Sequence, residues 1–289
     1  MSKKRSLLVA ADIHEHKGMS RLEEVLRLVR DDPDVIQPDT VLMGGDYAGG
    51  GRPPRMGGRL DEWVPVFSLN DLKKDIRDIL GSDVSVYLTY GSHDLNAVEG
   101  CGGFFSGPED RGDYYLYGIS FCQMRYAYSG QLEEMKYDGT DLDDPFGKCA
   151  VQAAEHFTRW ERSLKDEKPV FVMSHMPLHA QRHDNLGAQI WCDALNRAAA
   201  KRPVYVFFAH NHHSEERPGA GPNYHFVQAG ETMPVQQGTR EAYADNSILF
   251  TYLNAGYILK GGAVLITIDG EQSFMQKPEI SVRRFCADR

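Results

Sequence analysis

Residues 6–14 read Ser-Leu-Leu-Val-Ala-Ala-Asp-Ile-His, an apolar run that leads directly into two ligand-type side chains, Asp12 and His14. A short apolar run that ends in polar residues is typical of a buried strand. The pattern recurs along the chain. We therefore predict five buried strands, at residues 6–11, 40–43, 84–90, 169–173 and 204–208.

Apolar residues recur at helical spacing between these strands. They predict helices at residues 22–29, 72–80, 151–164 and 190–198. Alternating strands and helices are typical of crossover units in a mostly parallel sheet, so the predicted fold class is α/β.

The chain changes character after residue 222. Apolar runs at 224–227, 248–253, 263–268 and 280–285 predict consecutive strands without helices between them, and we expect them to form a second sheet packed on the first. Because the sequence has no internal repeat and no low-complexity linker, residues 1–289 are predicted to form a single domain. Its irregular parts are a long loop at 48–59 and an insertion at about 95–147, which is predicted to contain a strand pair near residues 114–124.

Polar side chains follow each of the five predicted strands. In open α/β sheets ligands bind outside the carboxyl ends of the strands, so these side chains should converge on one crevice. Carboxylate oxygens and neutral imidazole nitrogens suit borderline divalent cations such as Zn²⁺, Mn²⁺ and Fe²⁺. The segments are Asp12-Ile13-His14, Gly44-Gly45-Asp46, Gly91-Ser92-His93-Asp94, Ser174-His175 and Ala209-His210-Asn211-His212.

These segments, in this order, resemble the motifs of the calcineurin-like metallophosphoesterase superfamily: Asp-x-His, Gly-Asp, Gly-Asn-His-Asp/Glu, His and Gly-His-x-His. The resemblance spans residues 12–212. It implies a four-layer α/β/β/α sandwich of two stacked mixed β-sheets flanked by helices. It also implies two divalent metal ions, one held by Asp12, His14, Asp46 and His212 and the other by Asp46, Ser92, His175 and His210.

The reaction implied by the resemblance is metal-dependent hydrolysis of a phosphate ester. Two metals roughly 3.5–4 Å apart lower the pKa of a water bridging them and hold the phosphoryl oxygens. His93 would be the catalytic residue that assists the leaving group. Asp94 is expected to orient a neighbouring group. We expect a small phosphomonoester or phosphodiester as substrate, with nucleotides among the alternatives.

Some positions depart from the family pattern. Ser92 stands where the family has a metal-binding Asn. Its hydroxyl is a poorer donor on a shorter arm, so we expect it to ligate weakly or through water. Ala209 replaces the Gly of the last motif. Residues 49–51 are all Gly where the protein Ser/Thr phosphatases carry Asp-Arg-Gly, which places the chain outside that branch.

Charge and cysteine usage bear on partners and location. The net charge of −9 disfavours a nuclease acting on long DNA or RNA, and it disfavours an anionic membrane surface as partner. A catalytically weak scaffold that binds other proteins is an alternative, which only Ser92 favours. The five cysteines are odd in number and scattered, which favours a reducing compartment, and no apolar run reaches membrane-spanning length. We therefore expect a cytoplasmic protein.

Other side chains have both a functional and a structural interpretation. Three arginines in the 48–60 loop could grip a second phosphate or a carboxylate, although a solvated loop is the expectation. The aromatic cluster at 114–117 is interpreted as packing, not as a platform for a substrate ring. The histidines outside the motifs, including His156 and His179, are predicted to be surface residues.

Overall fold

The first apolar run forms β1 (Arg5–Ala10), the middle strand of a five-stranded sheet with the order β14-β13-β1-β2-β4. On one side β2 (Thr40–Met43) and β4 (Ser85–Leu88) continue the sheet in parallel. On the other side β13 (Gly262–Asp269) and β14 (Glu279–Cys286) add two antiparallel strands. The computed structural model describes residues 4–14, 16–47, 67–91, 94, 98–99, 105–119, 145–179, 187–213, 217, 221–224, 226–237, 239–269 and 279–286.

A second five-stranded sheet has the order β12-β9-β8-β7-β6. It is parallel from β12 to β7, and β6 pairs antiparallel with β7. The strands are β6 (Gly107–Asp110), β7 (Tyr115–Ile119), β8 (Val170–Ser174), β9 (Val204–Phe208) and β12 (Thr251–Asn254). Both sheets are therefore mixed.

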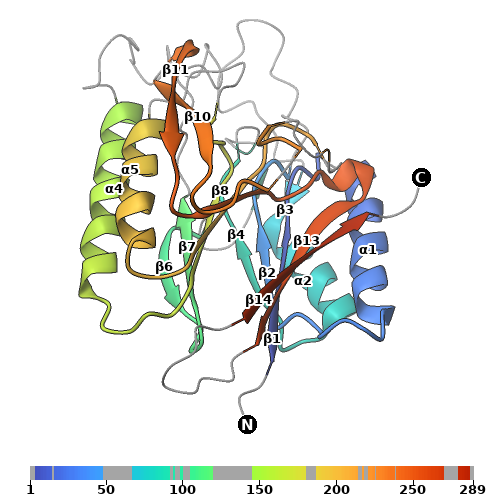
Figure 1. Ribbon diagram of the computed structural model, residues 1–289. Coiled ribbons are helices and arrows are strands. Elements are labelled where there is room, and N and C mark those ends of the chain that lie inside the picture. The colour runs from blue at the N-terminus through green and yellow to red at the C-terminus, as the bar shows by residue number, and fades with distance from the viewer. Residues whose placement is uncertain are drawn as a thin grey trace, which may run out of the picture.

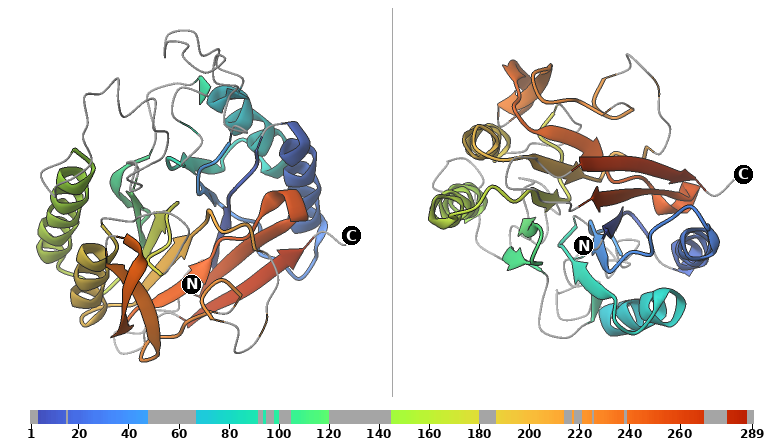
Figure 2. Two further views of the ribbon diagram at one scale, coloured as in Figure 1. Left: turned by 90° about the horizontal axis from the view of Figure 1, so that it is seen from above. Right: turned by 60° about the horizontal axis from the view of Figure 1, so that its bottom comes forward.

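Helices cover the outer faces of the two sheets (Figure 1). The first sheet packs against α1 (His16–Asp31) and α2 (Leu69–Leu80), and the second against α4 (Pro145–Ser163) and α5 (Ala188–Ala199). Seen from above, the two helix pairs lie on opposite sides with the sheets between them (Figure 2). The four layers confirm the predicted sandwich.

Each sheet buries both of its faces, because successive side chains of a strand point to opposite sides. In β1, Leu8 packs towards the helices and Val9 packs between the sheets. In β8, Val172 packs towards α4 and α5, whereas Phe171 packs between the sheets. The strands thus read as continuous apolar runs, which is why they were visible in the sequence.

The predictions for the first part of the chain are confirmed. All five predicted strands and all four predicted helices are present, with ends shifted by a few residues. The aromatic side chains at 114, 115 and 117 are buried in the packing, as expected. A strand pair lies within the predicted insertion, but it is β6–β7 and begins at Gly107, earlier than predicted.

The prediction for the tail is wrong. The tail does not form a second sheet; β13 and β14 extend the first sheet through β1, and β12 extends the second through β9. Accordingly, the five early strands are divided between the two sheets. The apolar run of β13 is buried on both faces, so it predicts a strand inside the sandwich, but its position in the sequence does not reveal which strands it pairs with.

Two further differences concern residues 222–247. The described residues of the run at 224–227 form no strand; among them only Val227 makes an isolated bridge, to Tyr252. The antiparallel pair β10 (Thr232–Gln237) and β11 (Thr239–Ser247) was not predicted, because β11 is largely polar and exposed and lacks an apolar run. Shorter elements are β3 (Phe67–Ser68), β5 (Val98–Glu99) and a 3-10 turn, η2 (Ile258–Lys260).

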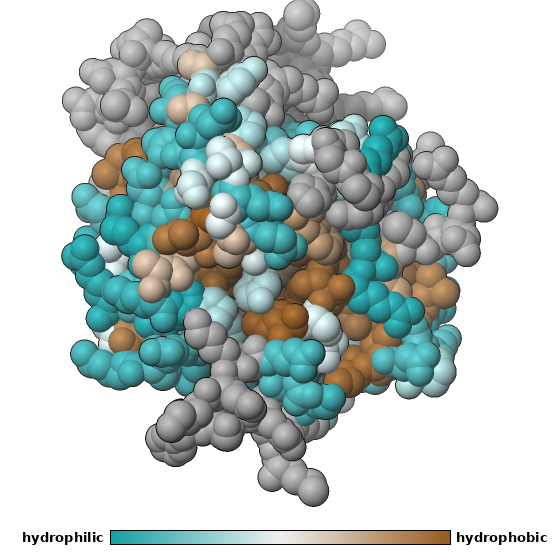
Figure 3. Space-filling view, in the orientation of Figure 1, coloured by the Kyte–Doolittle hydropathy of each residue, from teal (hydrophilic) through white to brown (hydrophobic). Residues whose placement is uncertain are grey.

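The outer surface agrees with this layering. Hydrophilic residues cover much of the two helical sides, and hydrophobic residues show between them (Figure 3). No helix in the described parts of the chain is long and apolar enough to cross a membrane.

Candidate metal centre

Five of the predicted ligands have an uncommon backbone conformation. Asp12, His14, Asp46, His210 and His212 have φ between 50° and 71°, and they are the non-glycine residues with positive φ in the described part of the chain. A side chain in the left-handed region costs on the order of 1–3 kcal/mol, and such strain collects at functional sites. The strain therefore marks the ends of β1, β2 and β9 as a place that the fold holds in shape.

Hydrogen bonds join these strand ends to one another. The N–H of Asp12 donates to the carbonyl of Gly45 at 3.1 Å, and the N–H of His14 donates to the carbonyl of Asp46 at 3.0 Å. Between the two sheets, the N–H of His210 donates to Oδ2 of Asp12 at 3.1 Å. Hydrogen bonds thus fix the turn after β1 to the turns after β2 and β9.

One group of side chains combines donors from both sheets. Ligand-type atoms of Asp12, His14, Asp46 and His212 all lie within 4.8 Å of one another. The Nε2 atoms of His14 and His212 are 2.9 Å apart, and Nε2 of His14 is 3.9 Å from Oδ2 of Asp46. Two carboxylates and two imidazoles at this spacing could hold one divalent cation.

A second group lies beside the first and shares Asp46 with it. Ligand-type atoms of Asp46, His175 and His210 lie within 4.8 Å of one another. Nδ1 of His175 donates to the carbonyl of Gly44 at 2.7 Å, which leaves Nε2 facing Oδ2 of Asp46 at 3.3 Å. A backbone partner on one ring nitrogen fixes the tautomer and orients the other nitrogen, as metal-binding histidines require.

The charges of the centre are buried. Asp12 and Asp46 have no exposed surface, and burial raises the pKa of Asp12 well above its usual range. Burial by itself would lower the pKa of His175, but the carboxylates of Asp46 and Asp12 and the Gly44 carbonyl outweigh it and raise this pKa to about 9. Within the described residues, Oδ1 of Asp12 is buried without a hydrogen-bond partner.

These features fit divalent cations. A buried carboxylate needs a positive partner, and the unpaired Oδ1 of Asp12 lies 4.0 Å from Nε2 of His212, as two ligands of one cation would. A cation would take the place of the proton that the carboxylates favour on His175, so binding would release protons.

Two glycines bring Asp46 into place. Gly45 has φ of 87° and packs against Gly91 so closely that a Cβ on Gly45 would collide with the Gly91 backbone. A Cβ on Gly91 would collide with the backbone nitrogen and Oδ1 of Asp46. The predicted turn glycines are therefore required by the close approach of the β2 and β4 ends.

The side chain of Asp94 holds the turn that carries Asp46. Its buried carboxylate accepts hydrogen bonds from the backbone N–H groups of Asp46 (2.9 Å), Tyr47 (2.9 Å) and Gly91 (2.8 Å). Burial and the charge of Asp46 raise the pKa of Asp94 to about 7. The group that Asp94 was expected to orient is thus the backbone around the shared carboxylate.

The sequence of this centre matches a known family. A family model described as calcineurin-like phosphoesterase matches residues 5–214. The chain belongs to the calcineurin-like phosphoesterase family. The match begins at β1 and ends just after the last histidine motif, so it includes every predicted ligand of the phosphoesterase centre.

Two solved structures are similar to this phosphoesterase at low identity. One is a conserved uncharacterized protein, a predicted phosphoesterase, from Streptococcus pneumoniae, with 10% identity, a TM-score of 0.31 and coverage of 98% of this chain and 100% of that one. The other is a phosphopantetheinyl hydrolase from Mycobacterium tuberculosis, with 12% identity, a TM-score of 0.38 and coverage of 89% and 92%. No curated protein sequence matches the chain.

The structure groups six of the seven predicted ligands in the two sets that the resemblance implied. Their role as ligands stays a prediction. Ser92, the seventh, and the predicted catalytic residue His93 lie outside the described residues, between Gly91 and Asp94. The three arginines of the 48–60 loop also lie outside them.

Sequence reasoning missed one residue and misplaced another. Tyr257, which follows β12, stacks on His212 with ring centroids 4.5 Å apart; it stands in a tail without a motif, so nothing in the sequence pointed to it. His179 was predicted to be exposed, but only 3% of it is exposed, and it hydrogen-bonds to Tyr252 and Asn223. The prediction was wrong because its partners lie far along the chain. His156 is exposed, as predicted.

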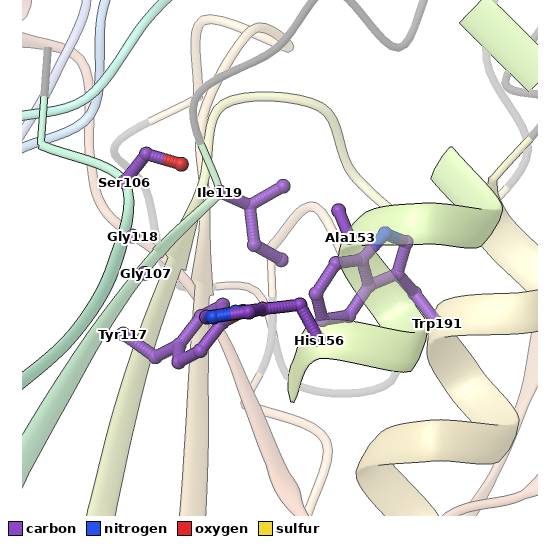
Figure 4. Close-up of a pocket in the computed structure, with 8 residues that line it drawn as sticks. All are labelled: Ser106, Gly107, Tyr117, Gly118, Ile119, Ala153, His156 and Trp191. Atoms are coloured by element: carbon purple, nitrogen blue, oxygen red, sulfur yellow. The ribbon is translucent and has the colours of Figure 1, made fainter. Parts of the chain in front are cut away.

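A separate cavity of about 180 Å³ lies on the α4 and α5 side of the second sheet (Figure 4). Its described lining is mostly aromatic and apolar and contains none of the six grouped ligands. It is lined by Ser106, Gly107, Tyr117, Gly118, Ile119, Ala153, His156 and Trp191.

Proposed function

We propose that this family member hydrolyses a phosphate ester with the help of two divalent cations. The observation that supports the proposal is the sharing of Asp46 by two groups of ligand-type side chains, one with Asp12, His14 and His212 and the other with His175 and His210. In this proposal Ser92 completes the second group weakly or through water.

The cations would lower the pKa of a water and offset the negative charge of the phosphoryl oxygens. The four histidines among the donors favour Mn²⁺, Fe²⁺ or Zn²⁺ over Mg²⁺ or Ca²⁺. Asp94 and the Gly45–Gly91 contact keep the shared carboxylate in position, and burial excludes water from behind it.

His93 is proposed to hydrogen-bond or protonate the leaving oxygen, a role worth typically about 10²–10⁴-fold in rate. The proposed substrate is a small phosphomonoester or phosphodiester, with nucleotides included. A nucleic-acid polymer or a membrane is not a proposed partner, because the chain carries a net charge of −9. The scattered cysteines support a cytoplasmic location.

The test is hydrolysis of p-nitrophenyl phosphate and bis-p-nitrophenyl phosphate by metal-stripped protein, with and without added Mn²⁺. Turnover restored by the cation supports the proposal, and the preferred compound separates a monoesterase from a diesterase. If neither compound is hydrolysed with Mn²⁺, Zn²⁺, Fe²⁺ or Ni²⁺, the hydrolase proposal fails for these substrate classes, and a scaffold that keeps the fold becomes the better interpretation.

A further inference from the structure

A polar network lies directly behind the two histidines that follow β9. Its members come from three separate parts of the chain: His179 follows β8, Asn211 lies between His210 and His212, and Asn223 lies in the segment 221–224. Nε2 of His179 is 2.7 Å from Oδ1 of Asn223, and Nδ2 of Asn211 is 2.5 Å from the same oxygen. The amide oxygen of Asn223 is thus the meeting point of two strand-end loops.

The hydrogen-bond directions of this network follow from its chemistry. The N–H of Leu178 donates to the hydroxyl oxygen of Tyr252 at 2.6 Å, which turns the Tyr252 proton towards Nδ1 of His179 at 3.1 Å. Nδ1 is then an acceptor, so Nε2 carries the proton and donates to Asn223. A neutral His179 is consistent with its burial, which lowers its pKa to about 4. Nδ2 of Asn211 also lies 3.2 Å from Nε2 of His179, and both nitrogens then donate to the same Asn223 oxygen.

Asn223 also holds a third loop. Nδ2 of Asn254, a buried residue at the end of β12, donates to the Asn223 carbonyl at 3.2 Å. Oδ1 of Asn254 accepts from the N–H of Gly256 at 2.9 Å, and Gly256 precedes Tyr257, the residue that stacks on His212. Asn223 therefore connects three segments: its side-chain oxygen joins those after β8 and β9, and its backbone carbonyl binds Asn254 at the end of β12.

The two histidines on either side of Asn211 belong to different ligand groups, His210 to the one with His175 and His212 to the one with His14. Both have positive φ, 71° and 56°, so their turn needs contacts that hold it. Asn211 is the residue between them, and its side chain is anchored on Asn223. A shift of Asn211 would move both imidazoles together.

We propose that the side chain of Asn223 positions both metal groups, acting through Asn211 on His210 and His212. This inference rests on the proposed function, since it takes the two groups to bind cations. Partners behind metal ligands typically contribute about 10–100-fold in metal affinity or activity. Asn223 lies more than ten residues from either histidine motif and carries no family signature, so only the contacts identify it.

The test compares cation affinities of purified full-length variants. Asn223→Ala removes the amide oxygen, Asn223→Asp keeps an acceptor at the same place, and Asn196→Ala is a matched control. Asn196 is also half-buried and also joins two segments, donating to the carbonyl of Ser247 and accepting from the N–H of Leu249, away from the ligand groups. Calorimetric titration with Mn²⁺ gives stoichiometry and affinity, and thermal melting of the metal-free proteins gives stability.

We expect Asn223→Ala to weaken Mn²⁺ binding at both sites by about 10–100-fold. Asn223→Asp should recover most of that affinity, and Asn196→Ala should bind Mn²⁺ as the wild type does while melting at a lower temperature. The inference is overturned if Asn223→Ala binds Mn²⁺ as tightly as the wild type, whatever its melting temperature. Failure of the wild type itself to bind Mn²⁺ would instead overturn the proposed function, so the two failures are distinguishable.

Discussion

The ring of Tyr257 lies flat on the imidazole of His212, with ring centroids 4.5 Å apart and an angle of 8° between the planes. The same tyrosine approaches the ring of His14 edge-on at 6.3 Å. The backbone around it is fixed, because the N–H of Ile258 donates to the carbonyl of Ala11 at 3.1 Å, one residue before Asp12. Tyr257 therefore packs against both histidines of one ligand group.

Replacing this ring should loosen that group. We expect Tyr257→Ala to lower Mn²⁺ affinity at one of two sites by roughly 10-fold, as loss of a contact behind a ligand does. Tyr257→Phe keeps the ring and should bind like the wild type. Calorimetric titration measures this, and equal losses in the Ala and Phe variants would show that the hydroxyl, not the stacking, matters.

Asp46→Asn should abolish turnover of p-nitrophenyl phosphates while the protein stays folded. An amide cannot supply the charge that the shared position requires, yet it has nearly the same shape as the carboxylate. Circular dichroism and a thermal melt check the fold. Near wild-type turnover in buffers of defined metal content would contradict the assignment of Asp46 to both groups.

Gly91→Ala should disturb the centre without replacing a predicted ligand. The new Cβ would collide with the backbone nitrogen and Oδ1 of Asp46, so the shared carboxylate must move. We expect at least about a 10-fold loss of Mn²⁺ affinity and a stability loss of roughly 1–3 kcal/mol. Gly230→Ala is the control: its φ of 96° strains a side chain, but a Cβ there meets nothing within 4 Å. Unchanged Mn²⁺ binding in Gly91→Ala would show that the turn around Asp46 can move aside without loss of affinity, which contradicts this prediction.

Burial of His179 should make the metal-free protein sensitive to acid. Its pKa in the folded protein is about 4, below the ordinary value of 6.5. As the pH falls from 6.5 to 4 the unfolded chain takes up a proton that the folded chain does not, so stability is lost over that interval, by about 3 kcal/mol.

Denaturant unfolding at several pH values checks this effect. His179→Gln should remove that share of the pH dependence, whereas the same change at the exposed His156 should leave it in place. Parallel curves for His179→Gln and the wild type would refute a buried neutral histidine.

Ser92→Asn should preserve or strengthen cation binding at one site, because an amide carbonyl is a better neutral donor and reaches further than a hydroxyl. A calorimetric titration with Mn²⁺ measures stoichiometry and affinity. If neither changes relative to the wild type, Ser92 is not a ligand.

The sequence predicted the positions of the helices and strands better than it predicted which strands pair with each other. Runs such as that of β1 are apolar on both faces, so their burial could be recognised locally. Whether β13 pairs with β1 or with a strand of the other sheet depends on contacts between distant segments, and no local pattern encodes that choice. The strand β11 is mostly polar, and its apolar stretch, Ala242-Tyr243-Ala244, is too short to predict a strand.

For the centre, the ordered motifs were enough to gather Asp12, His14, Asp46, His175, His210 and His212 into two groups. The residues behind them could not be predicted. Tyr257, Asn223 and His179 make stacking contacts or hydrogen bonds with partners elsewhere in the chain, and each residue type is common in ordinary loops. The position of these residues in the sequence does not indicate which side chains they contact in the folded protein.

The division of ligands between the sheets has a consequence for folding. Asp12 and Asp46 end strands of the first sheet, whereas His175, His210 and His212 end strands of the second. A cation bound to both would act as a cross-link that closes the long stretch of chain from Asp12 to His212. By analogy with a disulfide across a loop of that size, the entropy removed from the unfolded chain is worth on the order of 5 kcal/mol. Chelation would then also lower the stability of the fold, because it would remove a cross-link between the two sheets and leave the apolar layer between them to hold them together.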